Sequence, residues 1–229
     1  MTQQTTSDMT WASELRAHSL RNHSHAHAEV PLADVWHALE QGTSFVADHF
    51  NSDRRCYLVL QQRPLDASAT SPSTRNREIL RRILLGEPQK VLALELGLSA
   101  SSVAVVARQC AGAMGVPVCA RRLPTVLVMA AHASLRGSCL RARMSSLLLR
   151  DTCYEVLSVE RLAPSERLSL SEAERMVVDL LVDRRSNAEI ARIRRTSPRT
   201  VANQVTNVLQ KLRARGRGEV LLRLIEAGA

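Results

Sequence analysis

Aromatic residues are scarce in this chain, where Phe, Trp and Tyr together make up 3% of 229 residues. Hydrophobic residues nevertheless make up 45% of the chain, so its cores must be built from Leu, Val, Ile and Ala. This composition favours helices over the aromatic-rich interior of a β-sandwich. The length allows one large domain or two small ones.

Long apolar runs are also missing. A membrane-spanning helix needs about 18 consecutive apolar residues. The longest candidate, residues 123–135, is shorter and predicts a core segment. The opening MTQQTTSDMT is polar and lacks the apolar region of a signal peptide. These absences predict a cytoplasmic protein that does not associate with a membrane.

Cysteine pairs with redox or zinc spacing are absent as well. The five cysteines are Cys56, Cys110, Cys119, Cys139 and Cys153. No two of them form a Cys-x-x-Cys motif, and their number is odd. Without a secretion signal this indicates a reducing compartment, so we expect mostly buried structural thiols. A redox-sensing role for one of them is the alternative.

Motifs for catalysis and cofactor binding are not found. The chain has no Gly-x-x-x-x-Gly-Lys phosphate loop, and no Ser/His/Asp or Cys/His set stands out. His23, His25 and His27 alternate and could hold a metal on an extended segment. The polar composition around them favours a polar N-terminal tail over residues 1–29. We therefore expect no enzyme, no cofactor and no metal.

Positive charge, by contrast, is abundant. Lys and Arg number 31 against 22 Asp and Glu, a net charge of +9 at pH 7. Such a balance indicates a polyanionic partner, either a nucleic acid or an acidic membrane surface, and nucleic acid is favoured. The alternative is a solvated basic surface.

Helical and strand-like patterns alternate along the chain. Residues 30–64 predict a helix followed by a β-hairpin that turns at residues 51–53. Residues 65–118 predict a helical module. Residues 119–160 form a connecting segment with a second hairpin, and residues 161–229 are helical again.

An internal repeat relates the two helical regions. A shift of 98 residues aligns these pairs without a gap: Ser73 with Ser171, Arg77 with Arg175, Ala93 with Ala191, Ser99 with Ser197, and Val103 with Val201. A shift of 97 places Tyr57 on Tyr154 in the hairpins. We therefore expect two copies of one unit, each a hairpin followed by a helical module.

The C-terminal region carries start signals for three helices. Ser171 with Glu174, and Ser186 with Glu189, have the spacing of capping boxes. Ser197 precedes a proline, which suits the first position of a third helix. The fourth apolar segment, GEVLLRLIEAG, can close the core of the module or supply a dimer contact.

The third helix has one apolar and one polar face. The apolar face carries Val201, Val205, Val208, Leu209 and Leu212. The opposite face carries Arg199, Ala202, Asn203, Thr206, Asn207 and Gln210. An ordinary solvated face would be dominated by Glu and Lys. Asn and Gln amides can pair with adenine and a Thr methyl can pack on thymine, so this face suits the major groove of DNA.

Basic side chains surround this face. They are Arg192, Arg194, Arg195, Arg199, Lys211, Arg213, Arg215 and Arg217. Contacts between such side chains and phosphates release counterions, so DNA binding should weaken steeply with salt.

These motifs together resemble a known domain. The pattern LSEAERMVVDLL, followed by SNAEIARIRRTSPRTVANQVTNVLQKL, resembles the LuxR/FixJ-type (GerE-like) four-helix DNA-binding domain, a helix-turn-helix class. The resemblance covers roughly 60 residues. It implies a sequence-specific transcriptional regulator whose third helix enters the major groove of double-stranded DNA. It also implies a homodimer, with the fourth helix at the interface, and a contact with RNA polymerase.

The resemblance and the basic rim together imply a set of site residues. The base-facing residues are Ala202, Asn203, Gln204 and Thr206. The phosphate-facing residues are Arg192, Ser197, Arg199, Thr200, Asn207 and Lys211. Two positions depart from the family pattern. Arg194-Arg195-Thr196 occupies the turn that often holds glycine, and Ala202 stands where a long polar side chain is frequent, which shifts base reading to its neighbours.

Residues 65–118 look like a degenerate copy of this module. Gly97 keeps the turn glycine, but Ala104, Val105 and Arg108 occupy the face that would read bases. An apolar outer face favours packing or dimerisation over a second DNA reader. We expect a mainly α chain, α+β overall because of the hairpins. The alternative to a DNA-binding regulator is a protein-interaction adaptor that keeps the fold without specific DNA binding.

Overall fold

The computed structural model describes residues 2–21, 28–63, 72–116, 124–162, 168–183 and 185–228. The elements in these residues are α1 (Thr2–Arg21), β1 (Ala28–Pro31), α2 (Leu32–Gln41), β2 (Ser44–Asn51), β3 (Arg55–Gln62), α3 (Thr74–Leu84), α4 (Gln89–Leu96), α5 (Ala100–Ala113), α6 (Thr125–Arg136), β4 (Arg141–Leu149), β5 (Thr152–Glu160), α7 (Glu172–Val182), α8 (Asn187–Arg194), α9 (Pro198–Lys211) and α10 (Arg217–Gly228). The chain is mainly helical with one antiparallel sheet, so the expected mixed α+β class is confirmed.

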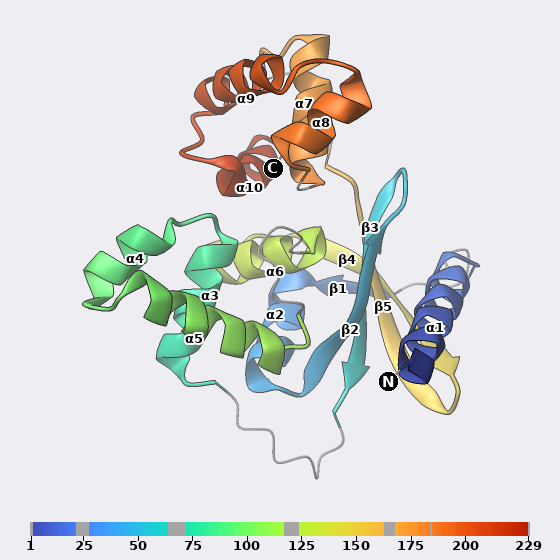
Figure 1. The fold of residues 1–229 in the computed structure, drawn as a ribbon. Helices are drawn as coiled ribbons and strands as arrows, with labels where there is room; N and C mark the ends of the chain where they lie inside the picture. The colour runs from blue at the N-terminus through green and yellow to red at the C-terminus, as the bar shows by residue number, and fades with distance from the viewer. Residues whose placement is uncertain are drawn as a thin grey trace.

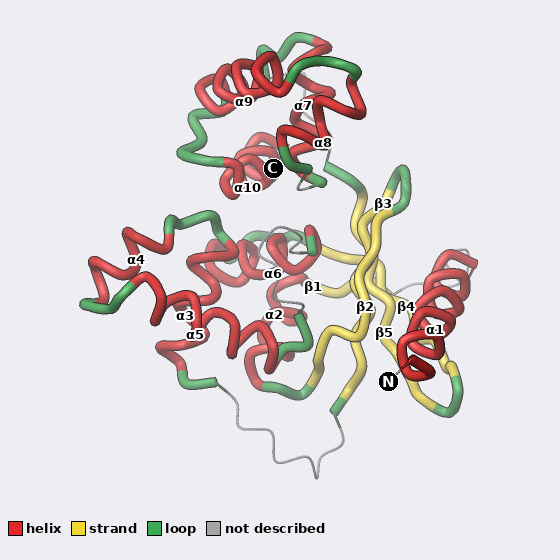
Figure 2. The backbone as a smooth tube through the Cα atoms, viewed as in Figure 1, coloured by secondary structure: helices red, strands yellow, loops and turns green. Residues whose placement is uncertain are grey.

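The five strands form a single sheet in the order β1-β4-β5-β3-β2. The sequence predicted two hairpins in separate segments, residues 30–64 and 119–160. Both hairpins are present, but they join through antiparallel pairing of β3 with β5 (Figure 2). These central strands are apolar on both faces because both faces are covered. The separation into two segments was therefore wrong, since strands about 100 residues apart in sequence share one core.

Helices cover the two faces of the sheet (Figure 1). On one face, Leu58 and Leu157 pack in a cluster with α2 and α6, and Trp36 of α2 is fully buried. Most of α6 is buried, which confirms that residues 123–135 supply a core segment. On the other face, Val59 and Val156 pack in a cluster with Leu15 of α1.

The described part of the expected polar tail, residues 2–21 and 28–29, is instead structured. Residues 2–21 are helical, and the described side chains of α1 dock on the sheet. Leu15 is fully buried, and the guanidinium of Arg16 donates to both carboxylate oxygens of Asp48, at 2.7 and 2.9 Å. The composition concealed this helix because, among its described side chains, Leu15 is the apolar residue that packs in the sheet cluster. His23, His25 and His27 lie outside the described residues.

The cysteines are less uniformly buried than expected. Cys56 and Cys110 are buried, and burial raises the pKa of both thiols. Cys139 and Cys153 are exposed. Cys119 lies outside the described residues.

The central pairing of the sheet has local two-fold symmetry. Val59 pairs with Val156, its own equivalent under the 97-residue shift. On either side, Tyr57 pairs with Ser158, and Tyr154 pairs with Gln61. These two pairs exchange places under the same shift. The contact between the two hairpins therefore has the geometry of a symmetric dimer interface, contained in one chain.

The helical modules show the same correspondence. Helices α7, α8 and α9 begin and end 98 residues after α3, α4 and α5, respectively. The Ser99 hydroxyl accepts from the backbone N–H of Ser102, and Ser197 does the same for Thr200. Each pair places a serine cap at the start of the third helix. The second module continues into α10, which packs against α7 and α6.

Candidate nucleic-acid interface

One carboxylate, that of Glu174, holds the start of α7 in place through contacts with two partners. The Ser171 hydroxyl accepts from the N–H of Glu174, whose carboxylate accepts from the N–H of Ser171 at 2.8 Å. The same carboxylate lies 2.7 Å from the Lys211 ammonium at the end of α9. These contacts lower the pKa of Glu174, the Lys211 hydrogen bond most of all. Glu174 thus ties the start of α7 to the end of α9.

A second capping box begins α8. The Glu189 carboxylate accepts from the backbone N–H and from the hydroxyl of Ser186, both at 2.8 Å. These hydrogen bonds, with a smaller effect from Arg185, lower the pKa of Glu189 to about 2. Both boxes lie where the sequence predicted them, because a capping box depends only on residues three apart.

The turn between α8 and α9 depends on a left-handed residue. Arg195 ends α8 with φ 52° and ψ 47°, a conformation that favours glycine. The equivalent residue in the first module is Gly97, with φ 64° and ψ 32°. The turn has kept its geometry although arginine replaces glycine. Ser197 then caps α9, and Pro198 occupies its first position as expected.

Helix α9 buries its apolar face and exposes a polar one. Val201, Val205 and Val208 are buried. The exposed residues of the outer face are Arg199, Asn203, Thr206, Asn207 and Gln210. Thr206 donates to the carbonyl of Ala202, at 3.0 Å. Within the described residues the other four side chains make no hydrogen bond or ion pair, so their polar groups can bind a ligand.

Two of the expected base-facing residues are placed differently. Ala202 and Gln204 are half-buried. The amide oxygen of Gln204 accepts from the guanidinium of Arg194, so this side chain joins α9 to α8. Gln204 is about 100° around the helix from Asn203. Gln210, which was predicted on the outer face but not among the base-facing residues, is exposed seven positions after Asn203.

The basic rim is smaller than the sequence indicated. Arg192, Arg195, Arg199, Arg213 and Arg215 are exposed. Arg217 instead donates to the carbonyl of Arg185 and to the side chain of Asn187, and burial lowers the pKa of its guanidinium. The Lys211 ammonium contacts Glu174, while 44% of the lysine side chain stays exposed. Arg194 and Arg217 therefore hold the module together.

The first module lacks the equivalents of several of these polar groups. Leu94 stands where the second module has Arg192, and it is 85% exposed. Val105, 45% exposed, stands at the position of Asn203. The pair formed by Glu174 and Lys211 has no counterpart, because its equivalents are Asn76 and Ala113. At the positions of Arg192 and Asn203 the first module is therefore apolar, whereas Arg108 and Gln109 are exposed at the positions of Thr206 and Asn207.

Comparison with known proteins identifies the C-terminal module. The sequence model of the family described as "Bacterial regulatory proteins, luxR family" matches residues 168–224. The chain is 37% identical over 59 residues to the spore germination protein GerE of Bacillus subtilis (strain 168), covering 26% of this chain and 80% of that protein.

The chain belongs to the LuxR family of bacterial regulatory proteins. It is a DNA-binding transcriptional regulator, and the resemblance recognised in the sequence is confirmed. Family membership gives double-stranded DNA as its partner. The family is a class of DNA-binding regulators and not a class of enzymes. No solved structure matches the chain.

The described residues contain no group of three or more His, Cys, Asp or Glu that could hold a metal ion. No single helix among them is long and apolar enough to cross a membrane. Helices α4 and α5 reach that length and composition only as a pair, and they meet at 106°.

Proposed function

We propose that this LuxR-family regulator reads DNA sequence with the outer face of α9. The observation that carries the proposal is the row of exposed polar side chains on that helix, in which Arg199, Asn203 and Gln210 make no hydrogen bond or ion pair among the described residues. Asn203, Thr206 and Gln210 follow one another at helical spacing and reach base edges in the major groove. Arg199 begins the same row and contacts either a base or a phosphate.

Phosphate contacts hold the helix in register. Arg192, Ser197, Arg199, Thr200, Asn207 and Lys211 surround the reading face in this proposal. All six are exposed. Such contacts carry little sequence information, but they set the salt dependence of binding. Lys211 acts twice, because its ammonium also anchors Glu174.

Substitution of Asn203 tests this assignment. In full-length protein, Asn203→Ala should lower the preference for the selected sequence by about 1–3 kcal/mol at one or two base pairs, while affinity for random duplexes stays the same. Bound duplexes are selected from a random pool, and their affinities are then measured at several salt concentrations. The matched control is Val105→Ala in the first module, which should leave the preference unchanged. Equal effects of both substitutions would contradict the proposal.

The remaining residues form a separate regulatory unit in this proposal. In it, residues 161–229 form the DNA-binding domain and residues 65–118 form a degenerate copy of that domain's helical module. The exposed Leu94 and Val105 of that module favour a protein contact over phosphate binding. This observation also supports the second candidate function, a protein-interaction adaptor. Failure to enrich any duplex, with a folded protein, would favour the adaptor.

Two copies of the chain bind an inverted repeat in this proposal, and an activator would also contact RNA polymerase. The four apolar residues of α10, namely Val220, Leu221, Leu224 and Ile225, are buried within one chain. A dimer formed through α10 therefore requires this helix to leave α6. Sedimentation of the chain with a duplex carrying one or two half-sites measures how many copies bind.

A further inference from the structure

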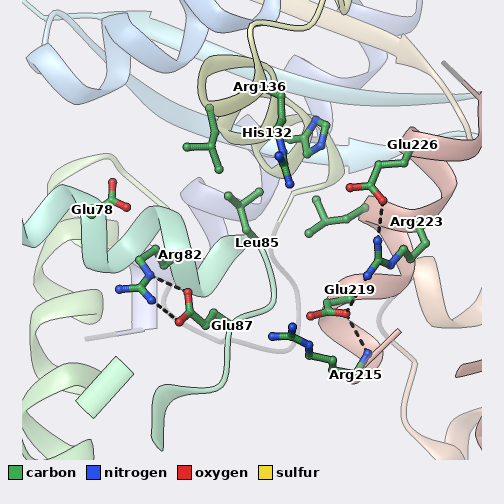
Figure 3. Close-up of a pocket in the computed structure, with 12 residues that line it drawn as sticks. Glu78, Arg82, Leu85, Glu87, His132, Arg136, Arg215, Glu219, Arg223 and Glu226 are labelled. Carbon is green, nitrogen blue, oxygen red and sulfur yellow. Dashed lines mark hydrogen bonds and ion pairs between the residues drawn. The ribbon is translucent and has the colours of Figure 1, made fainter. Parts of the chain in front are cut away.

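An open cavity lies where the DNA-binding domain meets the rest of the chain. Its volume is about 360 Å³. Side chains from α3, α6 and α10 line it, with Arg82, His132 and Arg223 among them (Figure 3). A volume above about 300 Å³ is typical of small-molecule sites. Neither the reading face of α9 nor the symmetric strand pairing uses this cavity.

The acidic groups of the cavity are already satisfied. Its four carboxylates have partners in the described residues: Glu78 pairs with Arg81, Glu87 with Arg82, Glu226 with Arg223, and Glu219 accepts from the backbone N–H of Arg215. These contacts leave no carboxylate free to attract a cation.

Three basic groups in the lining have no such partner. The guanidinium groups of Arg136 and Arg215 are exposed and make no hydrogen bond or ion pair within the described residues. His132 is only 7% exposed, and neither of its ring nitrogens has a hydrogen-bond partner. Buried polar groups are nearly always hydrogen-bonded, so the His132 ring, whose two nitrogens are almost fully buried, is an unsatisfied group beside the cavity.

The protonation of His132 and the free guanidinium groups together indicate the chemical class of the ligand. Burial lowers the pKa of this imidazole, and the nearby Arg136 adds to the effect, whereas Glu226 opposes it. A neutral imidazole has one donor and one acceptor nitrogen. Two free guanidinium groups favour carboxylate or phosphate oxygens. Leu85, Leu135 and Leu222 supply an apolar wall beside them.

We propose that this cavity binds a small organic anion, with its carboxylate or phosphate at Arg136 and Arg215 and a short apolar part against the leucines. The ligand would bridge α6 to α10. It would therefore hold the DNA-binding domain against the N-terminal unit. A close backbone contact marks the same junction, because a Cβ added to Gly218 would lie 2.9 Å from the Cα of Gly86.

The test measures binding without DNA. Full-length protein is titrated with 3-phenylpropionate and with phenyl phosphate, and the His132 ring resonances are followed by NMR. We expect at least one anion to shift these resonances saturably, and a neutral analogue of similar shape, 3-phenylpropionamide for the carboxylate and phenyl methanesulfonate for the phosphate, to leave them unchanged. The two anions distinguish the carboxylate class from the phosphate class. No shift with either anion, or an equal shift with the neutral analogues, would overturn the proposal.

Variants locate the site. Arg136→Gln should weaken binding of the anion at least tenfold. Arg143→Gln is the matched control, because Arg143 is exposed on β4, away from the cavity lining, and its guanidinium makes no hydrogen bond or ion pair within the described residues. Equal weakening by both variants would show that the anion responds only to net charge, and it would overturn the site.

The coupling to DNA rests on the proposed function and is measured separately. With the selected duplex, the anion should change DNA affinity at least threefold, and the duplex should change anion affinity by the same factor. Anion binding without any change in DNA affinity would confirm the cavity as a ligand site and contradict the coupling. If the protein binds the anion but shows no preference for any DNA sequence, the result would contradict the assignment of DNA reading to α9. It would not contradict the cavity as an anion site.

Discussion

Replacement of Arg195 by glycine should stabilise the DNA-binding domain. Arg195 has φ 52°, and a non-glycine residue in the left-handed region costs about 1–2 kcal/mol. Glycine removes this strain but gains about 0.5–1 kcal/mol of entropy in the unfolded chain. The difference predicts that Arg195→Gly raises the free energy of local unfolding by about 0.5–1 kcal/mol, or two- to fivefold in the opening equilibrium.

Hydrogen exchange in the full-length protein measures this local effect. The amide of Thr196, bonded to the carbonyl of Ala191 at 2.9 Å, reports on the turn itself. Its exchange should slow about two- to fivefold in Arg195→Gly. Arg195→Asn removes the charge and keeps a side chain that tolerates the left-handed region, so it separates charge from strain.

The first module supplies the reverse experiment. Gly97 has φ 64°, and a Cβ added there would meet nothing within 4 Å. Gly97→Ala therefore introduces backbone strain alone and should destabilise the turn between α4 and α5 by about 1 kcal/mol. Faster exchange in Arg195→Gly, or no effect of Gly97→Ala, would refute the strain argument.

Three further predictions follow from contacts elsewhere in the chain. Leu15→Ala should detach α1 from the sheet, because Leu15 is fully buried and truncation of a buried leucine costs about 2–5 kcal/mol of stability. Limited proteolysis should then cleave α1 faster than in the unsubstituted protein. An unchanged rate of cleavage would contradict the docking of α1. The folded pKa of Glu189, about 2, lies below its usual value, so its stabilising effect is complete above about pH 4.5 and is lost as the pH falls towards 2. Acid unfolding of α8, followed by hydrogen exchange, should therefore depend less on pH in Glu189→Gln, and an unchanged pH dependence would argue against the capping contact. Gly218→Ala should separate the DNA-binding domain from the loop at Gly86, because its Cβ would lie 2.9 Å from the Gly86 Cα; X-ray scattering in solution should show a larger radius of gyration, and an identical curve would contradict the contact.

Local features of the DNA-binding domain were determined by the sequence alone. The capping boxes at Ser171 and Ser186, the Ser197 cap and the valine face of α9 all appear where the pattern predicted them. Each depends on interactions between residues of one helix, three or four positions apart. The turn at Arg195 is different, because the loss of the family glycine predicted a reshaped turn, whereas Arg195 keeps the left-handed conformation of Gly97.

Contacts between distant segments were decided only by the tertiary structure. The pairing of β3 with β5 joins strands that are far apart in sequence, and no local pattern specifies which hairpin edge meets which. Among the described side chains of α1, Leu15 is the apolar residue that packs on the sheet. One leucine in a polar sequence is too weak a signal to distinguish a docked helix from a polar tail.

The same holds for the chemistry of individual side chains. Gln204 was predicted to face DNA bases and Arg217 to belong to the basic rim, yet both are held by partners on neighbouring elements. His132 reads as one polar residue within a core helix, and its unpartnered ring acquires meaning only where α3, α6 and α10 leave a cavity. Sequence periodicity determines which face of a helix is buried, whereas a side chain's partner depends on how separate elements pack, which only the folded chain decides.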